Sequence, residues 1–155
     1  MLKKVTSKSF KAVGGRFAII ASNYNQRYVD AMLRAAKTEL RRAGAAKVQV
    51  VRVPGAFEIP VVAGLLARSP LPCSAIICLG VILRGKTTHA QHIGEAVTQA
   101  LVQLQITTGV PVIHEVLLLE NEEQARVRCL GKEHNRGTEA AQTAIEMARV
   151  VAKLK

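Results

Sequence analysis

The sequence predicts an α/β protein in which helices pack on both faces of a four-stranded parallel sheet. Two patterns predict this class: short apolar runs typical of buried strands, and segments of helical periodicity that alternate with them. The chain has 155 residues, which suits one domain and leaves little room for two. We therefore expect one domain over residues 1–155, with 1–14 as an extended N-terminal segment.

Four segments have strand character. Phe17–Ala21 and Ala75–Leu83 are continuous apolar runs, typical of strands buried on both faces. Val48–Val53 is largely β-branched and ends at a Pro-Gly turn, and Val112–Leu119 is the fourth apolar run. Because helical segments separate these runs, we expect the strands to pair in parallel.

The helical segments place apolar residues three or four positions apart, which gives each an apolar stripe. Pro60 suits the first turn of a helix, where its missing N–H costs nothing. Gly44 and Gly109 are natural helix ends. The expected helices are Tyr28–Ala43, Pro60–Leu66, His89–Thr107, Asn121–Cys129 and Thr138–Lys153.

Ligands of open parallel sheets bind beyond the carboxyl ends of the strands. The segments in which to seek a site are therefore Ser22–Asn25, Pro54–Glu58, Gly80–His89 and the region after Val112.

The formal net charge of +11 first suggests a nucleic acid or another polyanion as partner. Residues 1–52 contain twelve Lys and Arg against two acids, a net of +10, whereas residues 53–155 contain ten against nine, a net of +1. The excess belongs to the first third of the chain. A polyanion-binding module therefore stays open, although the interleaved aromatics of a single-strand binder are missing.

Membrane insertion and secretion are not indicated by the sequence. No apolar run reaches the roughly 18–20 residues that span a bilayer, and the first residues contain no apolar signal-peptide core. The three cysteines form no Cys-x-x-Cys motif. We expect buried thiols in a reducing cytoplasm rather than a disulfide or a metal site.

The segment Gly80-Val-Ile-Leu-Arg-Gly-Lys-Thr87 matches the G-x-x-x-x-G-K-[ST] pattern of the phosphate-binding loop found in many NTPases. Its Val-Ile-Leu continues a strand, and no Asp follows Asp30 to hold Mg²⁺, for which Glu120 is an imperfect substitute. We therefore reject a nucleotide hydrolase. A glycine turn before a helix can still bind phosphate through free backbone N–H groups, although a capped helix start is the plainer interpretation.

Several segments form an ordered set over nearly the whole chain. The main motifs are Val53-Pro-Gly-Ala-Phe-Glu-Ile-Pro60, Gly85-Lys-Thr-Thr-His89, Glu123-Gln-Ala125 with Arg128, and Asn135-Arg-Gly-Thr-Glu-Ala-Ala141. Tyr24-Asn25 and Ala144-Ile-Glu-Met-Ala148 belong to the same set. Together and in this order, these segments resemble the 6,7-dimethyl-8-ribityllumazine synthase family.

The resemblance implies a three-layer αβα sandwich of flavodoxin-like fold and the penultimate step of riboflavin synthesis. The amine of 5-amino-6-(D-ribitylamino)uracil would join the ketone of 3,4-dihydroxy-2-butanone 4-phosphate. An imine forms, phosphate leaves, and the ring closes with loss of water to give 6,7-dimethyl-8-ribityllumazine. No metal and no redox cofactor are implied.

The resemblance also implies a set of site residues. His89 would shuttle protons, with Glu139 holding its other ring nitrogen. Phosphate would bind to Gly85, Lys86, Thr87 and Arg128. The pyrimidine and its ribityl chain would contact Tyr24, Ala56, Phe57, Glu58, Val81, Ile82, Leu83, His114 and Arg136.

On the residues alone, plainer interpretations of these positions stay open. His89 can be a polar helix start, Arg128 a solvated helix residue, and Glu139 a first-turn acid that favours the helix dipole. Metal ligation by His89, His92 and Glu95 is weakly indicated, because no Cys or third His is nearby.

Some residues depart from the family pattern. Ala90 and Gln91 stand where an aromatic and an acid are usual, and Arg136 stands where Lys is usual. His114-Glu115 occupies a segment that typically reads Phe-Gly. His114 could still stack on a heterocycle, whereas Glu115 adds bulk and charge near a subunit boundary.

The family resemblance implies a homo-pentamer with active sites between neighbouring subunits. We expect twelve pentamers to close into an icosahedral shell, because residues 128–135 carry no insertion relative to shell-forming members. Riboflavin synthase is a further partner that the resemblance suggests, while no nucleic acid or membrane is required. A shell or flavin-binding protein without catalysis stays open as an alternative.

Overall fold

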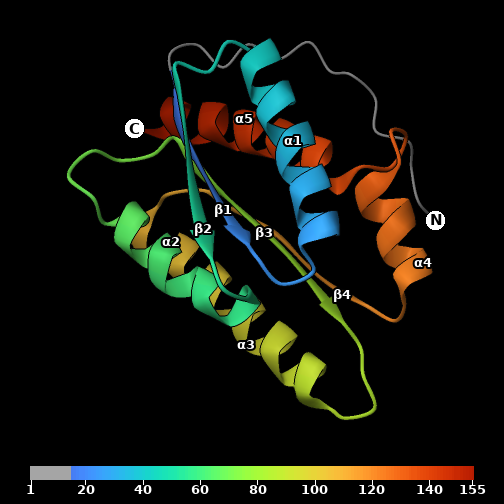
Figure 1. Ribbon diagram of the computed structural model, residues 1–155. Coiled ribbons are helices and arrows are strands. Elements are labelled where there is room, and N and C mark those ends of the chain that lie inside the picture. The colour runs from blue at the N-terminus through green and yellow to red at the C-terminus, as the bar shows by residue number, and fades with distance from the viewer. Residues whose placement is uncertain (1–14) are drawn as a thin grey trace.

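The computed structural model describes residues 15–155 and contains a parallel four-stranded sheet of order β2-β1-β3-β4 (Figure 1). The expected extended segment 1–14 lies outside the described residues. The strands are β1 (Arg16–Ser22), β2 (Lys47–Val53), β3 (Ala75–Leu83) and β4 (Val112–Leu119). All four lie where the apolar runs predicted them.

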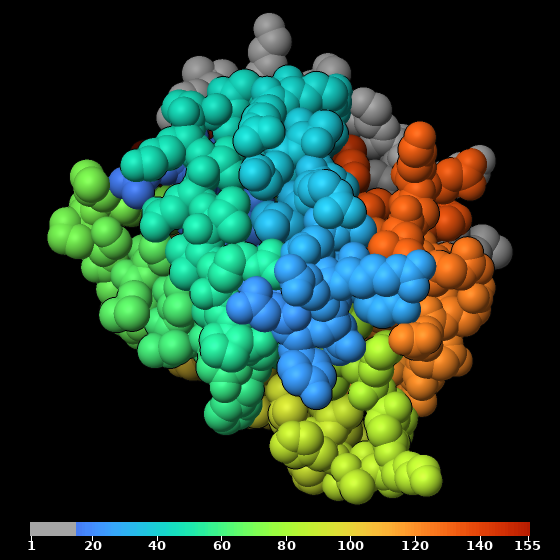
Figure 2. Space-filling model, viewed as in Figure 1, coloured from blue at the N-terminus to red at the C-terminus, as the bar shows by residue number. Residues whose placement is uncertain are grey.

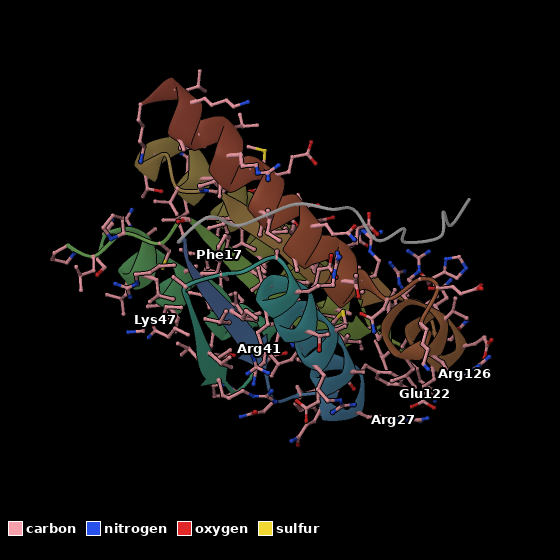
Figure 3. All side chains as sticks on the ribbon, turned by 90° about the horizontal axis from the view of Figure 1, so that it is seen from above. Phe17, Arg27, Arg41, Lys47, Glu122 and Arg126 are labelled. Atoms are coloured by element: carbon pink, nitrogen blue, oxygen red, sulfur yellow. The ribbon has the colours of Figure 1, made fainter. Side chains whose placement is uncertain are left out.

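The helices form the two outer layers, which confirms the predicted sandwich. Helices α1 (Gln26–Arg42) and α5 (Arg136–Leu154) cover one face of the sheet, and α2 (Ile59–Ala67) and α3 (His89–Thr108) cover the other (Figure 1). Seen from above, α1 and α5 lie over the sheet, with the segment bearing Glu122 and Arg126 at one end (Figure 3).

Strand β1 shows why its sequence is apolar without interruption. Phe17, Ile19 and Ala21 belong to the core under α1 and α5, whereas Ala18 and Ile20 belong to the core under α2 and α3. Successive side chains of a strand point to opposite faces, so a strand covered on both sides needs apolar residues at every position.

The helix expected over residues 121–129 is replaced by two shorter elements. Helix α4 (Glu122–Ala125) begins at Asn121, whose side chain accepts a hydrogen bond from the N–H of Gln124 at 3.0 Å. The π-helical segment η2 (Arg126–Leu130) follows. Wider π turns are frequent at functional sites. A short 3₁₀ helix, η1 (Ala56–Glu58), was also not predicted.

A buried asparagine joins η2 to α5. The side-chain amide of Asn135 donates to the carbonyl of Cys129 at 2.8 Å, and its oxygen accepts from the N–H of Gly137 at 2.8 Å. Gly137 lies against α1 so closely that a Cβ there would be 2.0 Å from the carbonyl oxygen of Met32. This junction therefore fixes where the first turn of α5 lies.

The cysteines are free and buried, as expected. Burial raises the pKa values of all three thiols, that of Cys129 to about 12, which makes them poor nucleophiles. None of the helices in residues 15–155 is long and apolar enough to cross a bilayer.

Candidate active site

A cleft of about 910 Å³ opens at the carboxyl ends of β1, β2 and β3. Its walls are the turn after β1, the Pro-Gly turn with η1 after β2, the last residues of β3, and the first two turns of α3. The stretch from the end of β3 into α3 projects at the lower edge of the molecule (Figure 2). Ten of the predicted site residues line this cleft: Tyr24, Ala56, Phe57, Glu58, Val81, Ile82, Leu83, Gly85, Thr87 and His89.

Two exposed aromatic rings stand at one side of the cleft. Tyr24 is 74% exposed and Phe57 is 61% exposed, although both lie beside an apolar lining. The N–H of Asn23 donates to the carbonyl of Val53 at 2.8 Å, and that of Tyr24 to Pro54 at 3.0 Å. These bonds tie the two turns together, so the aromatic rings share one cleft and offer a surface on which a heterocycle can stack.

Asn25 also lines the cleft, although the sequence predicted no role for it. Its backbone is left-handed, with φ 57°, and its side-chain amide donates to the carbonyl of Val81 at 2.7 Å. This bond links the start of α1 to the end of β3. Asparagine tolerates the left-handed conformation better than most residues. An asparagine directly after the first strand could therefore have indicated a tight turn at this position.

The loop from Gly85 to Thr88 leads directly into α3, whose first residue is His89. The hydroxyl of Thr87 accepts a hydrogen bond from the N–H of His89 at 3.3 Å, and Thr88 is bonded to the ring of His92 at 3.2 Å. The side chain of His89 is exposed beside the cleft. The first turn of this long helix presents backbone N–H groups and the positive end of the helix dipole, a favourable place for phosphate. Lys86, in the same loop, adds a positive charge.

Three other predicted site residues, Arg128, Arg136 and Glu139, lie on η2 and α5, where they gather around Glu115 of β4. Arg136 bridges two carboxylates: its Nε donates to Oε2 of Glu115 at 3.1 Å, and its Nη1 donates to Oε2 of Glu139 at 2.9 Å. Arg128 lies close enough for its charge to lower the pKa of Glu115. We call Glu115, Arg128, Arg136 and Glu139 the Arg136 cluster.

Glu115 is the buried member of the Arg136 cluster, with 6% of its surface exposed. Burial raises the pKa of this carboxyl from 4.5 to about 7, against the opposing influence of Arg136. Glu115 therefore changes charge near neutral pH.

His114, the remaining predicted residue, lies on β4 and faces α3. Its Nδ1 accepts from the N–H of Val116 at 3.1 Å, so this nitrogen carries no proton and Nε2 donates to the hydroxyl of Thr98 at 2.7 Å. Burial lowers the pKa of the ring. His114 is therefore a neutral, flat side chain rather than a proton carrier.

The predicted site residues thus fall into groups on opposite faces of the sheet. His89 begins α3 on one face, whereas Glu139 lies on α5 on the other, where it pairs with Arg136. The described part of one chain shows no contact between His89 and Glu139. A site that uses both residues needs the cleft of one copy and the Arg136 cluster of another.

The described residues contain no group of three His, Cys, Asp or Glu side chains that could hold a metal ion. His89, His92 and Glu95 therefore do not form a ligand set in this structure.

We expect replacement of Glu115 by glutamine to alter how stability depends on pH. A carboxyl whose pKa is raised on folding stabilises the protein below about pH 4.5, and that contribution is lost as the pH rises to about 7. The loss is on the order of 3 to 4 kcal/mol, since one pKa unit corresponds to about 1.36 kcal/mol. Urea unfolding at about pH 5 and about pH 8, at one protomer concentration, measures it. Equal pH dependence in both proteins would contradict the burial of an ionisable carboxyl.

Comparison with known proteins finds similarity over nearly the whole chain. The family model described as 6,7-dimethyl-8-ribityllumazine synthase matches residues 14–152. A protein of that name from Desulfotalea psychrophila is 43% identical over 149 residues, which cover 95% of this chain and 96% of the relative. One from Xylella fastidiosa (strain M12) is 40% identical over 146 residues, which cover 93% of this chain and 94% of the relative. One from Xanthomonas oryzae pv. oryzae (strain PXO99A) is 41% identical over 138 residues, which cover 88% of this chain and 89% of the relative.

Proposed function

Since the chain belongs to the 6,7-dimethyl-8-ribityllumazine synthase family, we propose that it joins 5-amino-6-(D-ribitylamino)uracil to 3,4-dihydroxy-2-butanone 4-phosphate. The products are 6,7-dimethyl-8-ribityllumazine, phosphate and water. The observation that carries this proposal is the cleft itself. It brings a phosphate-type helix start, His89 and two exposed aromatic rings to one edge of the sheet.

The pyrimidine stacks on the aromatic side of the cleft and contacts the backbone at the end of β3. Val81 to Leu83 supply backbone groups there, and Asn25 keeps the carbonyl of Val81 in place through its 2.7 Å hydrogen bond. Glu58 lies in η1 beside Phe57, where its carboxylate accepts hydrogen bonds from the ribityl hydroxyls.

The butanone phosphate binds with its phosphate at the loop before α3. Backbone N–H groups, Thr87 and Lys86 hold the anion, and Arg128 of a neighbouring copy adds a second cation. The ketone then lies beside His89, which moves protons as the imine forms and as phosphate leaves. Glu139 of the neighbouring copy orients the imidazole.

The assembly we propose is a homo-pentamer, with twelve pentamers closing into an icosahedral shell. Two observations support association of copies: the split of the site between opposite faces of one chain, and large apolar side chains exposed on the α2 and α3 side. These exposed side chains include Val61, Leu65, Val102 and Ile106. Riboflavin synthase, which uses the lumazine product, is a proposed partner, and the cytoplasm is the proposed location.

Replacing Lys86 by alanine is expected to raise KM for the butanone phosphate about fivefold to tenfold, because one charge facing phosphate is lost. The loss should shrink at high salt, since exposed charges are screened there. Steady-state kinetics at low and high salt measure both effects. Lys47→Ala is the matched control, since Lys47 is an exposed lysine at the opposite end of the sheet. An unchanged KM in the Lys86 variant would remove that residue from the phosphate site.

The proposal is tested by incubating the protein with both substrates and following the lumazine chromophore together with released phosphate. We expect the two products in equal amounts. Tight binding of the pyrimidine without turnover would instead favour a binding or shell protein, the alternative that His114 and Glu115 motivate. Salt-sensitive binding to nucleic acid without any turnover would favour the polyanion-binding alternative.

A further inference from the structure

The Arg136 cluster contains a carboxylate that the proposed reaction does not use. Glu115 lies on β4, paired in register with Leu79 of β3, and its side chain is buried beneath α5. A buried ionisable group is costly unless it is paired, and Arg136 supplies the hydrogen bond that Glu115 receives. Glu115 therefore stands as a paired carboxylate in a strand whose other buried side chains are mostly apolar.

The hydrogen bonds of Arg136 indicate that Glu115 helps to orient the guanidinium. Two different nitrogens of its guanidinium donate to carboxylates. Nε donates to Glu115 on strand β4, and Nη1 donates to Glu139, which lies on the same helix as Arg136. Because the guanidinium is planar and rigid, two contacts fix the direction of the whole group. Arg136 still keeps 28% of its side chain exposed, and within residues 15–155 its Nη2 makes no hydrogen bond.

We infer that Glu115 is a positioning residue that holds the Arg136 guanidinium in the orientation in which Nη2 receives the pyrimidine substrate. This inference rests on the proposed function. Glu115 and Arg136 then act as a matched pair: a lysine at position 136 could not bridge Glu115 and Glu139 through a planar fork.

The pair also makes substrate binding depend on pH. The charged groups around Glu115 are Arg136 and Glu139 on α5 and Arg128 on η2, with the thiol of Cys129 also nearby. Above about pH 7 Glu115 is ionised and holds Arg136 through a charge-assisted bond. Below that pH the carboxyl is neutral and its hold on the guanidinium is weaker. KM for the pyrimidine should therefore fall as the pH rises through about 7.

The test is the pH profile of KM and kcat for the unmodified protein and for Glu115→Gln. The glutamine keeps the size and an acceptor oxygen but stays neutral, so we expect KM for the pyrimidine to be high and flat with pH. Above neutral pH the increase should be about tenfold, the equivalent of one charge-assisted hydrogen bond, with little change in kcat. Glu39→Gln is the matched control, because Glu39 is another buried, arginine-paired carboxylate between α1 and α5.

Arg136→Lys provides a second arm if Glu115→Gln does not fold. It should raise KM for the pyrimidine by a similar factor and leave KM for the butanone phosphate unchanged. An active protein whose KM profile is the same in all variants would overturn this inference and leave the proposed function standing. Absence of turnover in the unmodified protein would overturn both.

Discussion

Alanine in place of His89 is expected to lower kcat by about 10²-fold to 10⁴-fold, the range for loss of a proton-transferring side chain. His89 lines the cleft as the first residue of α3, next to the loop in which we propose that phosphate binds, and we propose that it reaches the ketone of an anchored substrate. KM for either substrate should change much less, since the residue acts on protons rather than on binding. Steady-state kinetics with both substrates measure the effect.

The control for this prediction is His92→Ala, one turn further along the same helix. His92 also lines the cleft, and its ring is hydrogen-bonded to the Thr88 hydroxyl at 3.2 Å, but the proposed mechanism gives it no proton to transfer. Most of kcat should therefore survive in that variant. Full activity in His89→Ala, or equal losses in both variants, would remove His89 from its proposed role.

Replacing Gly137 by alanine is expected to destabilise the fold by more than about 4 kcal/mol, because a backbone clash in a packed core has no cheap relief. The added Cβ would lie 2.0 Å from the carbonyl oxygen of Met32, and 2.6 Å from its carbonyl carbon. Helix α5 would have to move away from α1, and the buried bonds of Asn135 would move with it. Chemical unfolding at fixed protomer concentration measures the change.

Gly94→Ala is the matched control for this substitution. Gly94 is also a helix residue, but a Cβ there would meet the side chain of Leu118 at 3.6 Å, an ordinary contact. Alanine is favoured over glycine in a helix by up to about 1 kcal/mol, so this variant should be as stable as the unmodified protein or more stable. If Gly137→Ala unfolded at the same denaturant concentration as Gly94→Ala, the described packing of α5 on α1 would be wrong.

The strands and the layers on either side of them could be predicted, because short apolar runs indicate buried strands and alternate with segments of helical periodicity. The uninterrupted run at Phe17–Ala21 indicates a strand covered on both faces, and the two cores divide its residues accordingly. The position of the cleft could also be predicted, since ligands of parallel sheets bind beyond the carboxyl ends of the strands.

The remaining features depend on contacts between distant parts of the chain. The pairing of Arg136 with Glu115 joins residues 21 positions apart, and no local pattern indicates it. The separation of His89 from Glu139 follows from which helix covers which face, a property of the folded topology.

We propose that one active site is built from the cleft of one copy and the Arg136 cluster of the next. The most direct measurement is the activity of mixed oligomers assembled from equal amounts of His89→Ala and Arg128→Ala subunits. Each variant alone should be strongly impaired. In the mixture about a quarter of the sites would pair an intact His89 with an intact Arg128 from its neighbour, so about a quarter of the activity should return. Activity that stays at the level of the separate variants would contradict a site shared between two copies.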